Sequence, residues 1–248
     1  MSDEWDFYLC QVEGELASIF LDLGIAAEAP TSSHSHMGYV SLTMLQPRTD
    51  GLSSQEEFEA LVAVEDDLTG TIVTGCGAIY VGRNTSAGHR DFYFYAPDSV
   101  RFAQAAKDAA ARHSAYRCEV GTSPDASWSA YFEFLSPSSD DRQRMMNRHV
   151  REALEERGDT LTEKRTIDHR AYFPSGYAAA SFATQIEKLG FDVAPAKAMD
   201  DGEYAIDFER MDLPDDMDDL TLHLVHLASE LAGVYDGWGC TIVSAKQD

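Results

Sequence analysis

The chain has 248 residues, of which 44% are hydrophobic, and carries a formal net charge of −24 from 43 acidic and 19 basic residues. This length and apolar content suffice for two domains with cores of their own, which excludes a mainly disordered protein. The acidic excess argues against direct binding of nucleic acid, because phosphate contacts need clustered lysine and arginine side chains, and it favours a basic protein partner.

The first half of the chain predicts a hairpin followed by alternating strands and helices. The expected elements are strands at 5–12, 15–22 and 38–45, a helix at 54–68, strands at 71–81 and 90–95, a helix at 98–112, and strands at 116–121 and 128–134. Ser54 and Glu57 have the spacing of a capping box, which predicts the start of the first helix. After the hairpin the pattern contains the order βαββαβ.

A domain boundary is predicted where Pro, Ser and Asp accumulate between a strand pattern and a helix pattern. The segment Leu135–Asp141 has this composition. It separates a first α+β domain at 1–137 from a second domain at 141–248.

The second domain repeats the architecture of the first. Its expected elements are a helix at 142–157, a strand at 161–173, a helix at 176–189, strands at 191–196 and 203–210, a helix at 214–232 and a strand at 240–244. Without the first helix the order is again βαββαβ. The chain is therefore predicted to be an α+β protein with two tandem ferredoxin-like domains, each with two helices on one face of an antiparallel sheet.

Motifs of common catalytic and cofactor sites are absent from the sequence. There is no GxSxG elbow, phosphate-binding glycine loop, dinucleotide fingerprint or HExxH motif. His34 and His36 form an HxH pair in a serine-rich loop, without a third ligand at a defined spacing. We therefore expect a non-catalytic protein, with no catalytic residue, no cofactor and no metal.

The densest acidic run lies between Met199 and Leu220, where ten acidic residues accompany one base, Arg210. Such an accumulation predicts a docking surface for an Arg/Lys-rich protein segment. The residues assigned to this surface are Asp200, Asp201, Asp215, Asp216, Asp218 and Asp219. Two other interpretations remain: turn and helix-start chemistry accounts for several acids singly, and a salt-adapted composition accounts for the total charge.

The segment Tyr235–Gly239, with sequence YDGWG, follows a leucine-rich helix pattern. It predicts a turn into the last strand, because Gly237 can adopt a positive φ without steric cost. Tyr235, Asp236 and Trp238 are candidate partner contacts, with the aromatic rings as anchors. The alternative is that both rings mainly pack in the core.

Arg83, His89 and Arg90 lie close together in a half of the chain that has few bases. They are a candidate anion site, which would give the first domain a ligand-binding or enzymatic role. Pairing with nearby acids is the simpler explanation. A purely structural or oligomerisation role is a third possibility for the protein, since exposed sheet edges associate readily.

The second half resembles the regulator of ribonuclease activity B, a bacterial family that inhibits ribonuclease E by binding it. The resemblance rests on Ile167–His169, Leu189–Val193 and, most specifically, Tyr235–Gly239. It implies a ferredoxin-like fold and a partner that is a ribonuclease or another RNA-processing protein.

The first half resembles an uncharacterised bacterial domain that is found fused ahead of such modules. The matching stretches are 82–85, 90–95 and 128–131. The acidic start of the chain has no signal-peptide pattern, and no apolar stretch reaches the ~18 residues of a membrane span. The four cysteines are widely spaced. We therefore expect a cytoplasmic protein with reduced cysteines and no membrane contact.

Overall fold

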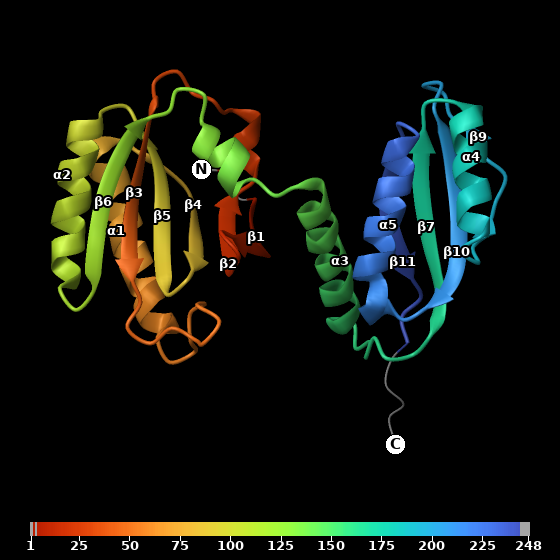
Figure 1. Cartoon of the computed structure of the whole chain (residues 1–248), viewed down its shortest axis with the longest axis horizontal. Coiled ribbons are helices and arrows are strands. Elements are labelled where there is room, and N and C mark those ends of the chain that lie inside the picture. Colours follow the sequence, from red (N-terminus) through yellow and green to blue (C-terminus); the bar gives the residue numbers. More distant parts are fainter. Residues whose placement is uncertain (1, 3, 244–248) are drawn as a thin grey trace. The chain divides into compact units, whose positions relative to one another are not determined.

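The structure is a computed structural model, and it describes residues 2 and 4–243. The chain divides into two compact units, Met1–Pro137 and Ser138–Asp248, which we call unit 1 and unit 2 (Figure 1). Both units combine an antiparallel sheet with helices, so the predicted pair of α+β domains is confirmed.

Unit 1 has a six-stranded sheet in the order β1-β2-β4-β5-β3-β6, in which all neighbours are antiparallel. Its strands are β1 (Trp5–Val12), β2 (Glu15–Asp22), β3 (His36–Thr43), β4 (Ile79–Ser86), β5 (His89–Ala96) and β6 (Arg117–Pro124), and its long helices are α1 (Phe58–Cys76) and α2 (Ser99–Ala110). Short helical turns are η1 (Gly24–Ala27), η2 (Ala111–His113) and η3 (Ala130–Leu135). The order β4-β5-β3-β6 is ferredoxin-like, and the β1–β2 hairpin extends it at the β4 edge.

Helices α1 and α2 cover one face of this sheet and form the core of unit 1. Buried apolar side chains from the sheet, such as Phe92 and Phe94, pack against Leu61 and Leu68 of α1 and Phe102 of α2. Asp98 caps α2, since its carboxylate accepts the backbone N–H groups of residues 100 and 101.

Helix α1 is longer than predicted, and residues 71–76, expected in a strand, form its last turns. Leu68, Ile72 and Cys76 continue one buried stripe at intervals of four residues, and packing of this stripe outweighs the strand preference of β-branched residues. The helix ends at Gly77, which has a φ of +69°. The expected capping box is not formed, because the Glu57 carboxylate instead accepts the backbone N–H groups of residues 45 and 46.

A strand was also expected at residues 128–134, and this prediction is wrong. Residues 130–134 instead belong to the helical turn η3, with Ser129 at its N-cap. The carboxylate of Asp125 accepts the backbone N–H groups of Ser129 and Ala130, at 2.8 and 3.0 Å, which starts the helical turn. Trp128 stacks on Tyr95 of β5, with ring centroids 3.9 Å apart. This segment therefore covers part of the sheet face that the long helices leave open.

Unit 2 has a second antiparallel sheet in the order β11-β7-β10-β8, with β9 also paired to β10. Its elements are α3 (Ser139–Glu155), β7 (Arg165–Phe173), α4 (Gly176–Glu187), β8 (Asp192–Val193), β9 (Lys197–Ala198), β10 (Tyr204–Asp212), η4 (Pro214–Asp216), α5 (Met217–Glu230) and β11 (Val234–Cys240). Buried residues of α4 and α5, including Phe182 and Leu224, share one core with Phe173 and Phe208 of the sheet. Both helices thus cover the same face, and the strand order is ferredoxin-like.

Helix α3 precedes this fold and packs against α5 and β11. It begins with a capping box between Ser138 and Asp141. No helix in the part of the chain that the structure describes is long and apolar enough to cross a membrane. All four cysteines lie within the described residues and are free thiols.

Candidate functional site

The segment Tyr235–Gly239 lies inside strand β11, which starts six residues earlier than predicted, so the expected turn is wrong. The pairing of β11 with β7 shifts between Tyr235 and Gly237, and Gly237 has a φ of +118°. This is a β-bulge at Asp236. In a regular strand Tyr235 and Trp238 would face opposite sides, because they are three residues apart. The extra residue Asp236 directs both rings to the core face.

Tyr235 contributes a hydroxyl to the core of unit 2, where it pairs with a histidine. The Tyr235 hydroxyl and Nδ1 of His169 are 2.7 Å apart, and the imidazole stacks on Phe208 with a centroid distance of 5.2 Å. Burial lowers the pKa of His169 to about 4 and raises the pKa of Tyr235 well above its usual range. His169 is therefore a neutral core residue at neutral pH.

Trp238 joins the sheet to helix α3 through a buried amide. Its indole Nε1 donates to Oδ1 of Asn147 at 2.8 Å, and Asn147 is fully buried. The same Oδ1 accepts from Gln143, while Nδ2 of Asn147 donates to Asp218 and to Thr221. The hydrogen-bonding capacity of the Asn147 amide is thus satisfied by α3, α5 and β11 together.

The aromatic rings of the motif are accordingly not partner anchors. Tyr235 is 7% exposed and Trp238 is 8% exposed, and both have hydrogen-bond partners within unit 2. The packing alternative holds for these two residues. Asp236, which the bulge leaves exposed, is the one polar side chain of the motif that a partner can reach.

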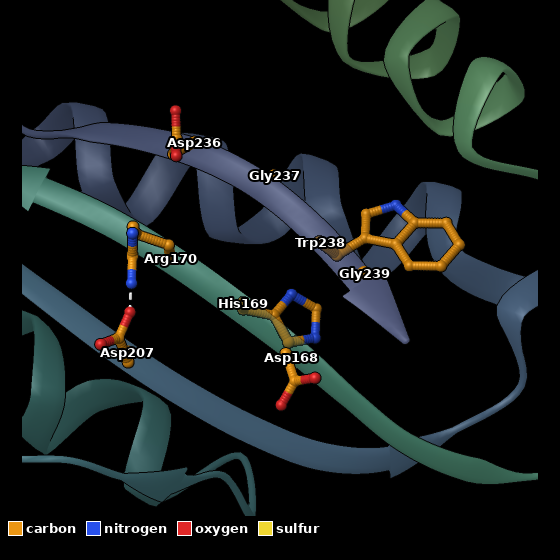
Figure 2. Close-up of a pocket in the computed structure, with 8 residues that line it drawn as sticks. All are labelled: Asp168, His169, Arg170, Asp207, Asp236, Gly237, Trp238 and Gly239. Carbon is orange, nitrogen blue, oxygen red and sulfur yellow. Dashed lines mark hydrogen bonds and ion pairs between the residues drawn. The ribbon is translucent and has the colours of Figure 1, made fainter. Parts of the chain in front are cut away.

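The face of the unit 2 sheet opposite α4 and α5 holds a shallow depression of about 290 Å³. Its lining residues come from β7, β10 and β11 and are Asp168, His169, Arg170, Asp207, Asp236, Gly237, Trp238 and Gly239 (Figure 2). We call this whole face of the unit 2 sheet the open face. Arg170 and Lys197 both pair with Asp207, at 2.6 and 3.1 Å. Arg170 in particular holds the pKa of Asp207 below its ordinary value.

Two like charges oppose each other on the open face. Asp168 of β7 and Glu209 of β10 are direct cross-strand partners, and both are exposed. Neither residue, nor Asp236, has an ion-pair partner within the described part of the chain. Gly239 lies opposite Asp168 on β11, where a Cβ atom would meet nothing within 4 Å. The open face therefore presents the unpaired carboxylates of Asp168, Glu209 and Asp236 beside an unobstructed strand. The exposed Asp192 of β8 is the cross-strand partner of Glu209 on its other side.

The acidic run that the sequence singles out is divided in the structure. Asp200 and Asp201 precede β10, whereas Asp215 and Asp216 follow it in η4. The nine residues of β10 separate the two groups by roughly 30 Å, at the usual rise of a strand. These acids therefore do not form one surface.

The acids at the start of α5 differ in whether they pair with other residues of unit 2. Asp218 accepts from Asn147 and pairs with Arg151 at 3.1 Å, so it is bound within unit 2. Asp215, Asp216 and Asp219 are exposed. Of the four predicted acids at the start of α5, these three remain as a candidate acidic surface.

The candidate anion site in unit 1 does not assemble. Arg83 pairs with Glu65 of α1 at 2.5 Å, and the buried Arg90 lies 3.7 Å from the same carboxylate, on the face that the helices cover. His89 is exposed and, as the neighbour of Arg90 in β5, points to the opposite face. Burial lowers the pKa of Arg90 to about 10. Both arginines thus lie against an acid of the same unit, as expected if they pair with nearby acids.

The described residues contain no group of three or more side chains that could hold a metal ion. His34 instead meets the hydroxyl of Ser33 and the carbonyl of Gly77, each at 2.9 Å.

Each unit matches the model of a known family. Residues 3–136, more than half of the chain, match the family of unknown function DUF695. The chain belongs to this family. Residues 144–240 match the model of the family described as regulator of ribonuclease activity B, so both resemblances noted in the sequence are confirmed. The second match starts in α3 and ends with β11, and it includes Asn147 as well as the open face.

A comparison with curated proteins gave no match. A solved structure described as a glycine cleavage system transcriptional repressor shares 10% identity, with coverage of 83% of this chain and 98% of that chain. Its TM-score of 0.26 is too low to support an argument.

The open-face acids of unit 2 went unrecognised as a site in the sequence. Buried and exposed residues alternate along β7, which contains Asp168, and along part of β10, which contains Glu209. That alternation was visible, but their juxtaposition depends on the pairing of two strands about 40 residues apart. Likewise, Asn147 was visible only as one polar residue in a charged helix.

Proposed function

We propose that this protein is a non-catalytic regulator that binds a ribonuclease, and that the open face of unit 2 receives a basic segment of that partner. The match of residues 144–240 to the regulator of ribonuclease activity B supports the class of function. The resemblance makes ribonuclease E the first partner to test, and another RNA-processing protein the alternative.

The observation that carries the proposal is the opposition of Asp168 and Glu209. Like charges directly opposite each other destabilise an antiparallel pair. An arginine or lysine from a partner removes this repulsion, and a guanidinium can form charge-assisted hydrogen bonds with both carboxylates. Binding of a basic side chain there relieves the electrostatic repulsion between the two carboxylates, whereas binding to isolated surface acids relieves no such repulsion.

The surroundings of this pair suit a protein segment. Asp236 adds a further unpaired carboxylate, and Gly239 leaves space beside Asp168 for an incoming side chain. The apolar Met211 and Val234 point to the same face by register and are more than half exposed. Acids flanked by apolar side chains are suited to a basic, partly apolar peptide.

Two triple variants with the same change in charge test the surface. The first replaces the open-face acids (Asp168→Asn, Glu209→Gln, Asp236→Asn), and the second replaces acids at the start of α5 (Asp215→Asn, Asp216→Asn, Asp219→Asn). Binding of the full chain to purified ribonuclease E is measured by calorimetry at two salt concentrations. We expect the first variant to bind at least about tenfold more weakly and the second to bind nearly as the unmodified chain does.

Four results would contradict the proposal. Equal weakening of both variants would mean that only total charge matters, and loss in the second variant alone would assign the contact to the start of α5. Absence of binding by the unmodified chain, even at low salt, would remove ribonuclease E as the partner. RNA cleavage by the purified chain would contradict a non-catalytic role.

A further inference from the structure

Unit 1 contains a second polar pocket, separate from the open face of unit 2. It has a volume of about 430 Å³ and lies on the sheet face opposite α1 and α2. Its floor and walls include Ser41, Asn84, Asp91, Tyr93 and Phe134. This volume is within the range of small-molecule sites.

The floor of the pocket is a row of polar side chains on three adjacent strands. Asp91 of β5 is paired directly with Asn84 of β4 on one side and with Ser41 of β3 on the other. Cross-strand partners point to the same face, about 5 Å apart, so these three side chains lie side by side. Three oxygen atoms are thus placed within reach of one ligand group.

Two acceptors in this row lack donors. Asn84 is only 6% exposed, and its Oδ1 has no hydrogen-bond partner within the described residues. Oδ1 of Asp91 is likewise buried without a partner there. Buried polar atoms are nearly always hydrogen-bonded in folded proteins, because leaving one unpaired is costly. Asn84 and Asp91 both line the pocket, so their two unpaired acceptors are suited to a ligand that brings donors.

The charge of the pocket favours a cation. Besides Asp91, the exposed Glu13 and Glu15 line it, and none of its lining residues is a lysine or arginine. Arg83 and Arg90 belong to the same strands but lie against Glu65 on the other face. Burial raises the pKa of Asp91, while the Ser41 hydroxyl and His89 act in the opposite direction.

Two aromatic rings form an apolar wall beside the polar row. Tyr93 of β5 and Phe134 of η3 have ring centroids 5.6 Å apart and an interplanar angle of 56°. Such faces accommodate an alkyl chain and attract a neighbouring cation. The wall and the row together suit a ligand with an apolar body and a cationic, donor-rich end.

We propose that unit 1 binds a small organic cation with a primary ammonium group, and that Asn84 and Asp91 accept its N–H donors. The alkyl part lies against Tyr93 and Phe134, and the two glutamates at the rim attract the charge. A metal ion is less suited, since the row offers only one carboxylate beside a neutral amide and a hydroxyl, and an anion would be repelled by the three acids. The proposal concerns unit 1 and is independent of ribonuclease binding by unit 2.

Calorimetric titration of the full chain with a set of related probes tests this site. Putrescine and butylamine should bind saturably, whereas tetramethylammonium, which has no N–H donor, should bind at least about tenfold more weakly. Butan-1-ol and butyrate should give no saturable binding. Lack of saturation by both amines would overturn the proposal and would mean that the buried acceptors are hydrated.

Matched variants separate the pocket from the general acidity of the chain. Asp91→Asn and Asn84→Leu should each weaken amine binding by about tenfold or more, and the exposed pair Glu13→Gln with Glu15→Gln by a smaller factor. Glu59→Gln removes one exposed charge from α1 and should leave binding unchanged. Circular dichroism checks that the floor variants fold, and the rim variants remain informative if they do not. Equal effects of Asp91→Asn and Glu59→Gln would overturn the proposal.

Discussion

The indole Nε1 of Trp238 donates a hydrogen bond to Oδ1 of Asn147 at 2.8 Å, and this contact fastens helix α3 to the last strand of unit 2. The β-bulge at Asp236 makes the contact possible, because it directs Trp238 to the core face together with Tyr235. The most specific motif of the sequence is therefore a structural device. By leaving Asp236 on the surface, it also contributes to the open face.

The Asn147 amide should be intolerant of a charge. In Asn147→Asp, the Nδ2 group that donates to Asp218 at 2.7 Å becomes a carboxylate oxygen beside another carboxylate. We expect unit 2 to lose about 3–5 kcal/mol in its free energy of unfolding. Trp238→Phe, which removes one donor and part of a ring, should cost about 2 kcal/mol. Urea denaturation followed by circular dichroism measures both, and an Asn147→Asp variant as stable as the unmodified chain would contradict the role of this amide.

The two glycines of the motif should respond differently to alanine. Gly237 has a φ of +118°, which an alanine adopts only with strain, so Gly237→Ala should cost about 1–3 kcal/mol. Gly239 has regular strand geometry and open space at its Cβ position, so Gly239→Ala should change stability by less than about 1 kcal/mol. Thermal unfolding of the two variants gives the comparison. Equal stabilities would mean that the bulge does not depend on glycine.

Acid should destabilise unit 2 through His169. Its pKa is about 4 in the folded chain and 6.5 ordinarily, because burial disfavours the charged imidazole. Between these values the unfolded chain binds more protons, so stability falls as the pH drops from 6.5 to 4, by about 3 kcal/mol in total. His169→Gln should flatten this part of the pH profile, whereas His223→Gln, a change at an exposed histidine of α5, should not. Parallel profiles for all three proteins would exclude His169 as the source.

A buried ion pair joins the first residue of β7, Arg165, to the loop before it and to the segment that follows β11. Arg165 Nη2 donates to Asp159 Oδ1 at 2.9 Å, and the Asp159 carboxylate also accepts the backbone N–H groups of Leu161 and Val243. The pKa of Asp159 is held far below its ordinary value, chiefly by the hydrogen bond from Arg165. Arg165→Met leaves this buried carboxylate without its counter-charge and should cost about 3–5 kcal/mol.

The double variant Asp159→Asn with Arg165→Met tests the cause. It should recover part of the lost stability, because no charge is then buried alone. Chemical denaturation at neutral pH compares the two variants. A double variant less stable than Arg165→Met would show that the aspartate matters mainly through its backbone contacts.

The predicted fold was recovered where the sequence pattern is long and local. Strands β1 and β2 lie at the predicted residues, because both alternate regularly around Glu13 and Gly14, which adopt the positive φ values of a tight turn. The βαββαβ order of both units followed from periodicity in the same way. The errors at residues 71–76 and 128–134 arose where a tertiary contact, the buried stripe of α1 or the carboxylate of Asp125, outweighed the local preference.

The candidate sites were harder to predict because strand pairing creates them. Asp168 meets Glu209, and Asn84 meets Asp91, only through the register of neighbouring strands. The acids clustered in the sequence at 200–219 were easier to recognise, yet β10 separates those at 200–201 from those at 215–219 in space. A bulge is also hidden from periodicity, since Tyr235 and Trp238 at a spacing of three do not resemble one face of a strand.

The most direct test of partner binding through the open face is an amide NMR titration of the full chain with a basic segment of ribonuclease E. We expect the largest chemical-shift changes at Asp168, Glu209 and residues 236–239, with a loss of these changes at high salt. Shifts concentrated at residues 215–219 or in unit 1, with β7, β10 and β11 unaffected, would contradict binding at the open face.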